Sequence, residues 1–242
     1  MILFRNSTAQ CLLGLLLLQV LSLTTHAQEN SPSLNTEFSC VIWKKLPYDE
    51  LYYRQGAEYL PLKLLANNRS QLYPLKGMEA LELYIPGVDE KERPIHTLVG
   101  TGTFPLSANR VIFFIVESGK KARFPLRILG IDDSLEGFPP GTTRFVNMSN
   151  LGLKVGFGSS VTKLKPKAMA TVESNAPSDG GFMPFIVTDD NGRRVYETRL
   201  MSQPNGRDMV FILPSERVAR PISLKFVPQV ISPKRGSVLD AP

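Results

Sequence analysis

Glycine and proline interrupt this chain at short intervals, with 18 glycines and 19 prolines among 242 residues. Beyond residue 27, no stretch keeps an apolar period of 3.6 residues for three helical turns, so we expect no long helices. Short runs rich in Val, Ile, Leu, Phe and Tyr recur instead. We predict strands at 38–43, 60–65, 81–85, 95–99, 111–116, 124–129, 143–146, 153–157, 169–172, 182–187, 195–200, 209–213 and 222–227. This pattern predicts an all-β fold of two tandem antiparallel immunoglobulin-like β-sandwich domains.

A segment rich in glycine, proline and acids divides the chain. Residues 130–141 read GIDDSLEGFPPG, and Pro139 and Pro140 cannot donate hydrogen bonds to a sheet. Each half is then about one hundred residues long, the size of an immunoglobulin-like sandwich. We expect a signal peptide at 1–27, an N-terminal β-sandwich at 28–130, a linker at 131–141, a C-terminal β-sandwich at 142–230 and a flexible tail at 231–242. Such a linker should be the segment most open to proteases.

The first 27 residues have the order of a secretory signal. Arg5 precedes an apolar run at 11–23, and small residues ending at Ala27 follow it, so we predict cleavage after Ala27. The apolar run is shorter than the roughly twenty residues that a membrane-spanning helix needs. We therefore expect a secreted or periplasmic protein, with no transmembrane segment in the mature chain.

Few residues of the mature chain could bind a metal or form a disulfide. The chain has two cysteines and two histidines, and Cys11 and His26 fall in the predicted signal, which leaves Cys40 and His96. This excludes an intrachain disulfide and a site built from several Cys and His ligands, so we expect no metal and no cofactor. We predict that Cys40 is a buried, unreactive thiol, with an intermolecular disulfide as the alternative.

The charge pattern does not indicate nucleic-acid binding. The formal net charge is +6, which is compatible with anionic partners in general. Lys163, Lys165 and Lys167 alternate along a predicted strand, but no aromatic residues are interleaved with them. Surfaces that bind nucleic acid combine basic and stacking side chains, so we expect no nucleic-acid partner.

The two halves resemble each other in sequence. Residues 60–64, LPLKL, match residues 151–155, LGLKV, and residues 110–115, RVIFFI, match residues 207–212, RDMVFI. The matches keep their order along the chain, which favours an internal duplication. Alternating strands also resemble one another by composition, so chance similarity between two sandwiches is the alternative.

Four of the seven tyrosines lie within twelve residues: Tyr48, Tyr52, Tyr53 and Tyr59. Asp49, Glu50, Arg54, Gln55 and Glu58 are interleaved with them. Aromatic rings flanked by polar groups suit contacts with carbohydrate or protein, so these tyrosines are our candidate ligand-binding residues. The alternative is that the rings fill the sandwich core with their hydroxyls bonded to the backbone.

Signals for catalysis are weak. His96 is the only imidazole left for general-base work, and the chain has no Gly-x-Ser-x-Gly motif, so we predict a structural or surface histidine. A pair of carboxylates could hydrolyse glycosides without histidine. The closest acids are Asp132 with Asp133, Asp189 with Asp190, and Asp89 with Glu90 and Glu92. All lie in predicted turns or the linker, where Asp commonly caps its own backbone, so we predict no catalytic residues.

The start of the second half resembles known exported proteins. Residues 143–149, TRFVNMS, followed by a strand and by Lys165 and Pro166, resemble the opening of uncharacterised exported bacterial tandem β-sandwich proteins. The tandem, basic, exported layout is also similar to that of periplasmic pilus chaperones. Neither resemblance implies catalytic residues. We expect an exported, non-catalytic binding, adhesion or assembly module of the cell envelope whose partner is an envelope protein or glycan. The alternatives are a secreted glycoside hydrolase or other hydrolase with a carboxylate pair, and a periplasmic chaperone-like protein.

Overall fold

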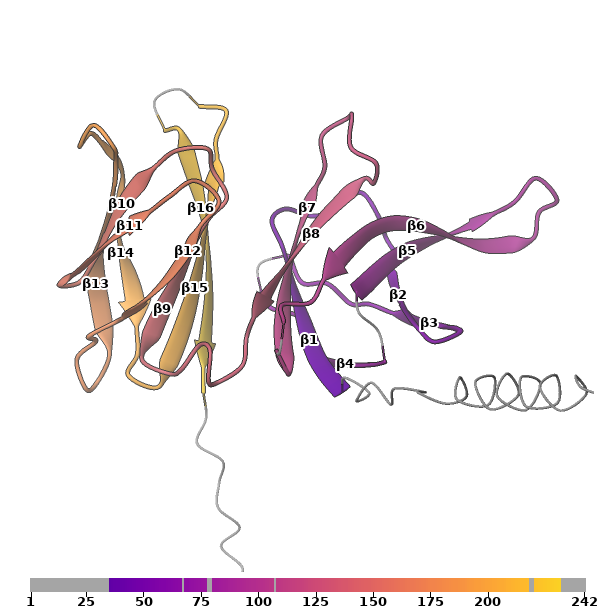
Figure 1. Ribbon diagram of the computed structural model, residues 1–242, viewed down its shortest axis with the longest axis horizontal. Coiled ribbons are helices and arrows are strands. Elements are labelled where there is room, and N and C mark those ends of the chain that lie inside the picture. The colour runs from indigo at the N-terminus through magenta and orange to yellow at the C-terminus, as the bar shows by residue number, and fades with distance from the viewer. Residues whose placement is uncertain (1–34, 67, 78–79, 107, 218–219, 232–242) are drawn as a thin grey trace, which may run out of the picture. The chain divides into compact units, whose positions relative to one another are not determined.

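The computed structural model describes residues 35–66, 68–77, 80–106, 108–217 and 220–231 (Figure 1). These residues belong to one compact unit and form sixteen β-strands, with no helix among them. They build two tandem sandwich-like units, each made of two four-stranded sheets. The predicted signal peptide at 1–27 and the tail from residue 232 onwards lie outside the described residues.

The first sandwich contains the first eight strands. One sheet has the order β4-β1-β7-β8, with β4 (Tyr73–Lys76), β1 (Asn35–Ile42), β7 (Arg110–Glu117) and β8 (Leu126–Asp132). The other has the order β3-β2-β5-β6, with β3 (Glu58–Pro61), β2 (Tyr52–Gln55), β5 (Ala80–Val88) and β6 (Pro94–Thr103). β1 and β7 run parallel, and the other pairs in these sheets are antiparallel.

The second sandwich repeats this plan strand for strand. One sheet has the order β12-β9-β15-β16, with β12 (Met169–Glu173), β9 (Thr142–Asn147), β15 (Gly206–Pro214) and β16 (Ile222–Val230). The other has the order β11-β10-β13-β14, with β11 (Ser160–Leu164), β10 (Leu153–Phe157), β13 (Gly181–Asp189) and β14 (Arg194–Ser202). β9 and β15 form the parallel pair that corresponds to β1 and β7.

Register shows which parts of the two halves correspond. Arg110 starts the parallel ladder of β7 and Arg207 starts that of β15, so the match between 110–115 and 207–212 agrees with the strand pairing. The match between 60–64 and 151–155 does not agree with the strand pairing. Leu153 pairs with Leu164 in a hairpin, and the hairpin of β2 and β3 makes Leu62 the counterpart of Leu164. Alternating apolar residues look alike at several offsets, so only hydrogen-bond register separates the true alignment from the false one.

The strand order differs from that of immunoglobulin domains. In those domains the first strand lies beside the second, whereas here β1 lies between β4 and β7. The sandwich prediction is therefore confirmed at the level of an all-β tandem fold, and its immunoglobulin-like detail is not. Three observed strands were not predicted from the sequence, namely β2, β4 and β11, which are only four or five residues long and partly polar.

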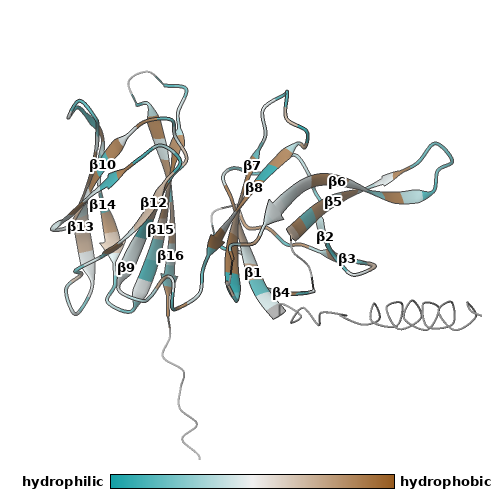
Figure 2. Ribbon diagram, viewed as in Figure 1, coloured by the Kyte–Doolittle hydropathy of each residue, from teal (hydrophilic) through white to brown (hydrophobic). Residues whose placement is uncertain are grey.

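Each sandwich has its own apolar core, and a third core lies between them. β7 and β15 are buried on both faces, because one face of each strand contacts the core of its own sandwich and the opposite face contacts the other sandwich. Phe114 and Phe211 occupy the same register position in their repeats, opposite Val41 and Val146, and their rings stack at 3.9 Å. The apolar colouring in Figure 2 is concentrated on the strands, while the loops are mostly hydrophilic.

Candidate functional site

Aromatic rings gather on the outer face of the sheet that contains β2, β3, β5 and β6. The ring of His96 stacks on that of Tyr59 with centroids 3.9 Å apart and planes 4° apart. Tyr52 meets His96 edge-on at 5.3 Å, and Tyr84 meets Tyr59 edge-on at 4.9 Å. We call Tyr52, Tyr59, Tyr84 and His96 the aromatic patch. Tyr59 is the most exposed of its tyrosines, at 36 % of its full accessible area.

Strand geometry explains why the clustered tyrosines separate. Successive side chains on a strand point to opposite faces, so Tyr52 joins the patch while Tyr53 points into the core. Tyr53 is buried, with its ring 5.2 Å from Phe38. Tyr48 is half-buried and packs against the same core. Of the four candidate residues, the structure therefore brings together Tyr52 and Tyr59 and places Tyr48 and Tyr53 elsewhere.

Two members of the patch were missed by sequence reasoning. Tyr84 reaches the patch because β2 pairs with β5 and Tyr52 lies directly opposite Tyr84. The ladder of β5 and β6 shifts register between Leu83 and Tyr84, as at a β-bulge, and bulges re-aim the side chains beside them. His96 comes from β6, 37 positions after Tyr59 in the sequence. In the described structure, the ring of His96 contacts the rings of Tyr52 and Tyr59.

Polar groups surround the rings. The Tyr52 hydroxyl donates to Glu50 at 2.9 Å, and the Tyr84 hydroxyl donates to Glu82 at 2.7 Å. Arg54 lies 3.7 Å from Glu82 as an exposed ion pair. The hydrogen bond to Glu50 raises the pKa of Tyr52, and burial raises that of Tyr84, so both hydroxyls stay protonated at neutral pH. The surface thus combines a half-exposed stacked ring pair with carboxylates and a guanidinium.

Several of the acids considered for a catalytic pair accept hydrogen bonds from neighbouring residues of their own turns. Asp89 and Asp189 occupy matching turns of the two repeats, where each accepts hydrogen bonds from the backbone and side chain of the arginine four residues later. Asp132 accepts a hydrogen bond from the backbone of Ser134 at 2.9 Å. Among the described residues, no group of three His, Cys, Asp or Glu side chains is placed to hold a metal ion.

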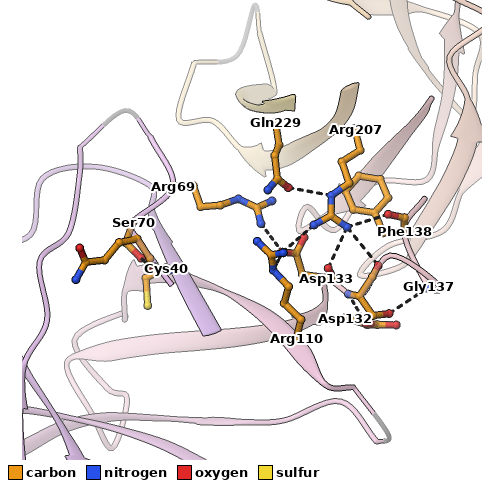
Figure 3. Close-up of polar contacts among 12 residues, drawn as sticks. Cys40, Arg69, Ser70, Arg110, Asp132, Asp133, Gly137, Phe138, Arg207 and Gln229 are labelled. Carbon is orange, nitrogen blue, oxygen red and sulfur yellow. Dashed lines mark hydrogen bonds and ion pairs between the residues drawn. The ribbon is translucent and has the colours of Figure 1, made fainter. Parts of the chain in front are cut away.

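Asp133 is the centre of a buried ionic cluster between the two sandwiches (Figure 3). Its side chain is fully buried and one carboxylate oxygen contacts Arg69, Arg110 at 3.3 Å and Arg207 at 3.2 Å. The same Arg207 donates to the carbonyl oxygens of Asp133 at 2.9 Å and Phe138 at 2.8 Å. Arg144 lies over the Phe138 ring at 4.5 Å. We call Asp133 and its three arginines the charge cluster.

The charge cluster joins matching positions of the two structural repeats. Arg110 and Arg207 are counterparts in β7 and β15, and both reach Asp133. Asp133 follows β8 beside Arg110, and the matching position beside Arg207 in the second repeat holds Gln229. Arg207 also donates to Gln229 at 2.9 Å. Burial lowers the pKa of Arg207 to about 10, so it remains charged at neutral pH beside Asp133. We therefore infer that the charge cluster holds the two sandwiches together.

The segment expected to be an open linker carries the end of β8 and part of this cluster. Asp133 and Phe138 are fully buried on either side of an exposed turn at Leu135 and Glu136. The glycines and prolines therefore shape a turn that packs against the body of the protein.

The single described cysteine agrees with its predicted role. Cys40 is buried in the first core, and burial raises its pKa well above the ordinary value. A buried, protonated thiol neither reacts nor reaches a second chain. The alternative of an intermolecular disulfide is therefore not supported.

No protein-family model matches this chain, and no curated protein matches its sequence significantly. Among the described residues, the structure has no helix with the length and apolar character that crossing a membrane requires.

Proposed function

We propose that this protein is an exported, non-catalytic binding module and that the aromatic patch binds a glycan of the cell envelope. The stacked, half-exposed pair of Tyr59 and His96 is the observation that carries the proposal. Aromatic faces offer apolar area at low cost in conformational entropy, and sugar rings present flat C–H faces that match them.

The polar groups around the patch support a sugar ligand. Glu50, Glu82 and Arg54 surround the rings, and hydroxyl-rich ligands need such acceptors and donors at the rim of an aromatic platform. Both carboxylates already accept a hydrogen bond from a tyrosine hydroxyl, which favours a role in holding the rings over proton transfer. The patch lies on a sheet face, so the ligand would be a chain lying across it.

Affinity electrophoresis tests this function. The purified chain would be run through gels containing soluble neutral polysaccharides (dextran and β-glucan) or anionic ones (alginate). We expect retardation by at least one of them, and Tyr59→Ala should weaken it by about 1 to 2 kcal/mol, roughly 5- to 30-fold in Kd. Phe182→Ala is the matched control, because Phe182 is an exposed aromatic residue of the second sandwich. Migration unaffected by every polysaccharide, or equal losses in the two variants, would refute the proposed site.

A further inference from the structure

Glycines close one edge of the first sandwich. A Cβ atom at Gly102 of β6 would lie 2.5 Å from Cγ2 of Ile128 in β8, and one at Gly130 would lie 2.4 Å from the carbonyl oxygen of Thr103. Real Cβ atoms do not approach other atoms so closely, so these positions accept only glycine. The two sheets can therefore meet along β6 and β8, and Ile128 is only 9 % exposed.

Residues with side chains occupy the same positions in the second sandwich. Strand register makes Thr198 of β14 the counterpart of Gly102, and Phe226 of β16 the counterpart of Gly130. Leu224 corresponds to Ile128 but is only half-buried. Phe226 is half-buried as well. β14 and β16 are end strands of their sheets, and the core of the second sandwich is less covered along this edge.

In the part of the chain that the structure describes, β15 is the only strand that pairs with β16, and the opposite edge of β16, which we call its free edge, presents hydrogen-bonding groups. The N–H of Ser215 donates to the carbonyl oxygen of Pro221 at 2.9 Å, and the N–H of Ile231 donates to the carbonyl oxygen of Asn205 at 3.0 Å. The backbone N–H and C=O groups of the odd-numbered residues of β16 therefore point toward β15. Even-numbered residues then direct their N–H and C=O groups outward. Pro228, which has no N–H, has this outward parity and removes one donor. Four residues of outward parity keep their N–H donors, namely Ile222, Leu224, Phe226 and Val230.

A basic cavity lies at the end of this edge. It has a volume of about 700 Å³, and Tyr196, Leu224 and Trp43 contribute to its lining. Its charged lining residues are Lys44, Arg217 and Arg220 against one acid, Glu216. The excess positive charge favours an acidic occupant, because opposite charges attract each other across such a cavity.

We propose that the free edge of β16 binds an extended acidic segment of a partner protein as an added β-strand. The added strand would pair with Ile222, Leu224 and Phe226, its apolar side chains would cover Leu224 and Phe226, and its acids would enter the basic cavity. Main-chain bonds supply affinity in this mode of recognition, and alternate side chains supply specificity. The site shares no residue with the aromatic patch.

A synthetic peptide provides the probe. Valine and threonine alternate over six residues in this peptide, and two aspartates follow. Trp43 is the only tryptophan of the chain and lines the cavity, so its fluorescence reports binding. We expect saturable binding and slower hydrogen exchange at Leu224 and Phe226. Two further peptides carry N-methyl groups on alternate backbone amides, one peptide on the odd-numbered amides and the other on the even-numbered ones. A strand directs every second amide toward a given neighbouring strand, so methylation should abolish binding of only one of the two methylated peptides.

Charge reversal tests the cavity without changing the core. Arg217→Glu with Arg220→Glu should weaken binding at least tenfold, whereas Lys120→Glu with Lys121→Glu should leave Kd unchanged. All four side chains are exposed, and the control pair lies in the loop between β7 and β8 of the first sandwich. Four results would overturn the proposal: no binding at millimolar peptide, equal binding of both methylated peptides, equal effects of the two charge reversals, or a dimer that forms through β16 in analytical ultracentrifugation.

Discussion

Asp133→Asn removes the only negative charge that contacts Arg207 in the charge cluster. Both side chains are fully buried, and Asp133 also contacts Arg69 and Arg110. Breaking a buried ion pair by removing one partner costs about 3 to 5 kcal/mol, because the remaining charge stays desolvated without compensation. We therefore expect Asp133→Asn to lower the free energy of unfolding by about this amount.

A variant of the same cluster supplies the contrast. The Arg110 side chain is 24 % exposed, and its loss leaves Asp133 with two other arginines. Partly solvated pairs contribute little, so Arg110→Met should cost about 1 kcal/mol or less. The double variant Asp133→Leu with Arg207→Met removes both buried charges and should be less destabilised than Asp133→Leu alone.

Urea unfolding at pH 7 measures these differences. Trp43 fluorescence follows the region between the sandwiches, because Trp43 packs against the shared core, and far-UV circular dichroism follows both sandwiches. If Asp133→Asn separates the sandwiches, the two signals should no longer coincide. A loss below 1 kcal/mol for Asp133→Asn, or a loss no larger than that of Arg110→Met, would show that the cluster does not hold the sandwiches together.

Three further predictions concern other parts of the molecule. Burial raises the pKa of Asp208 to about 7, so the contribution of the protonated carboxyl to stability is full below pH 4 and is lost as pH rises through 7. Asp208→Asn should remove about 1 kcal/mol per pH unit of this dependence between these pH values, and the melting temperature of the variant should therefore vary less with pH. Tyr53→Ala should lower the free energy of unfolding by about 3 kcal/mol or more because the ring is buried, whereas Tyr59→Ala should change the melting temperature little. A larger loss for Tyr59→Ala in thermal unfolding would contradict the placement of Tyr53 in the core and of Tyr59 on the surface. A recognition sequence for a site-specific protease, introduced at the exposed turn of Leu135 and Glu136, would allow the chain to be cut into two fragments. The fragments should still elute together in size-exclusion chromatography, and their separation would show that the sandwiches are held together only by the chain.

The aromatic patch shows where prediction from sequence stopped. The tyrosine cluster directed attention to the correct hairpin, yet only Tyr52 and Tyr59 belong to the patch, and Tyr84 and His96 come from strands more than twenty residues further on. Alternation along one strand separates Tyr52 from Tyr53 in principle. The side that faces the core is set by the neighbouring strands, which sequence alone does not identify.

The all-β fold and its tandem organisation followed from local properties of the sequence: frequent glycine and proline, short alternating apolar runs, and the recurrence of RVIFFI as RDMVFI. These properties act over a few residues, so they can be read without knowing which strands are neighbours. The tertiary structure alone decided the parallel pairing of β1 with β7, the burial of Asp133 among three arginines, and the contrast between Gly130 and Phe226 at the two sandwich edges. Each depends on contacts between residues far apart in the chain, where the free energy comes from register, desolvation and close approach of the backbone.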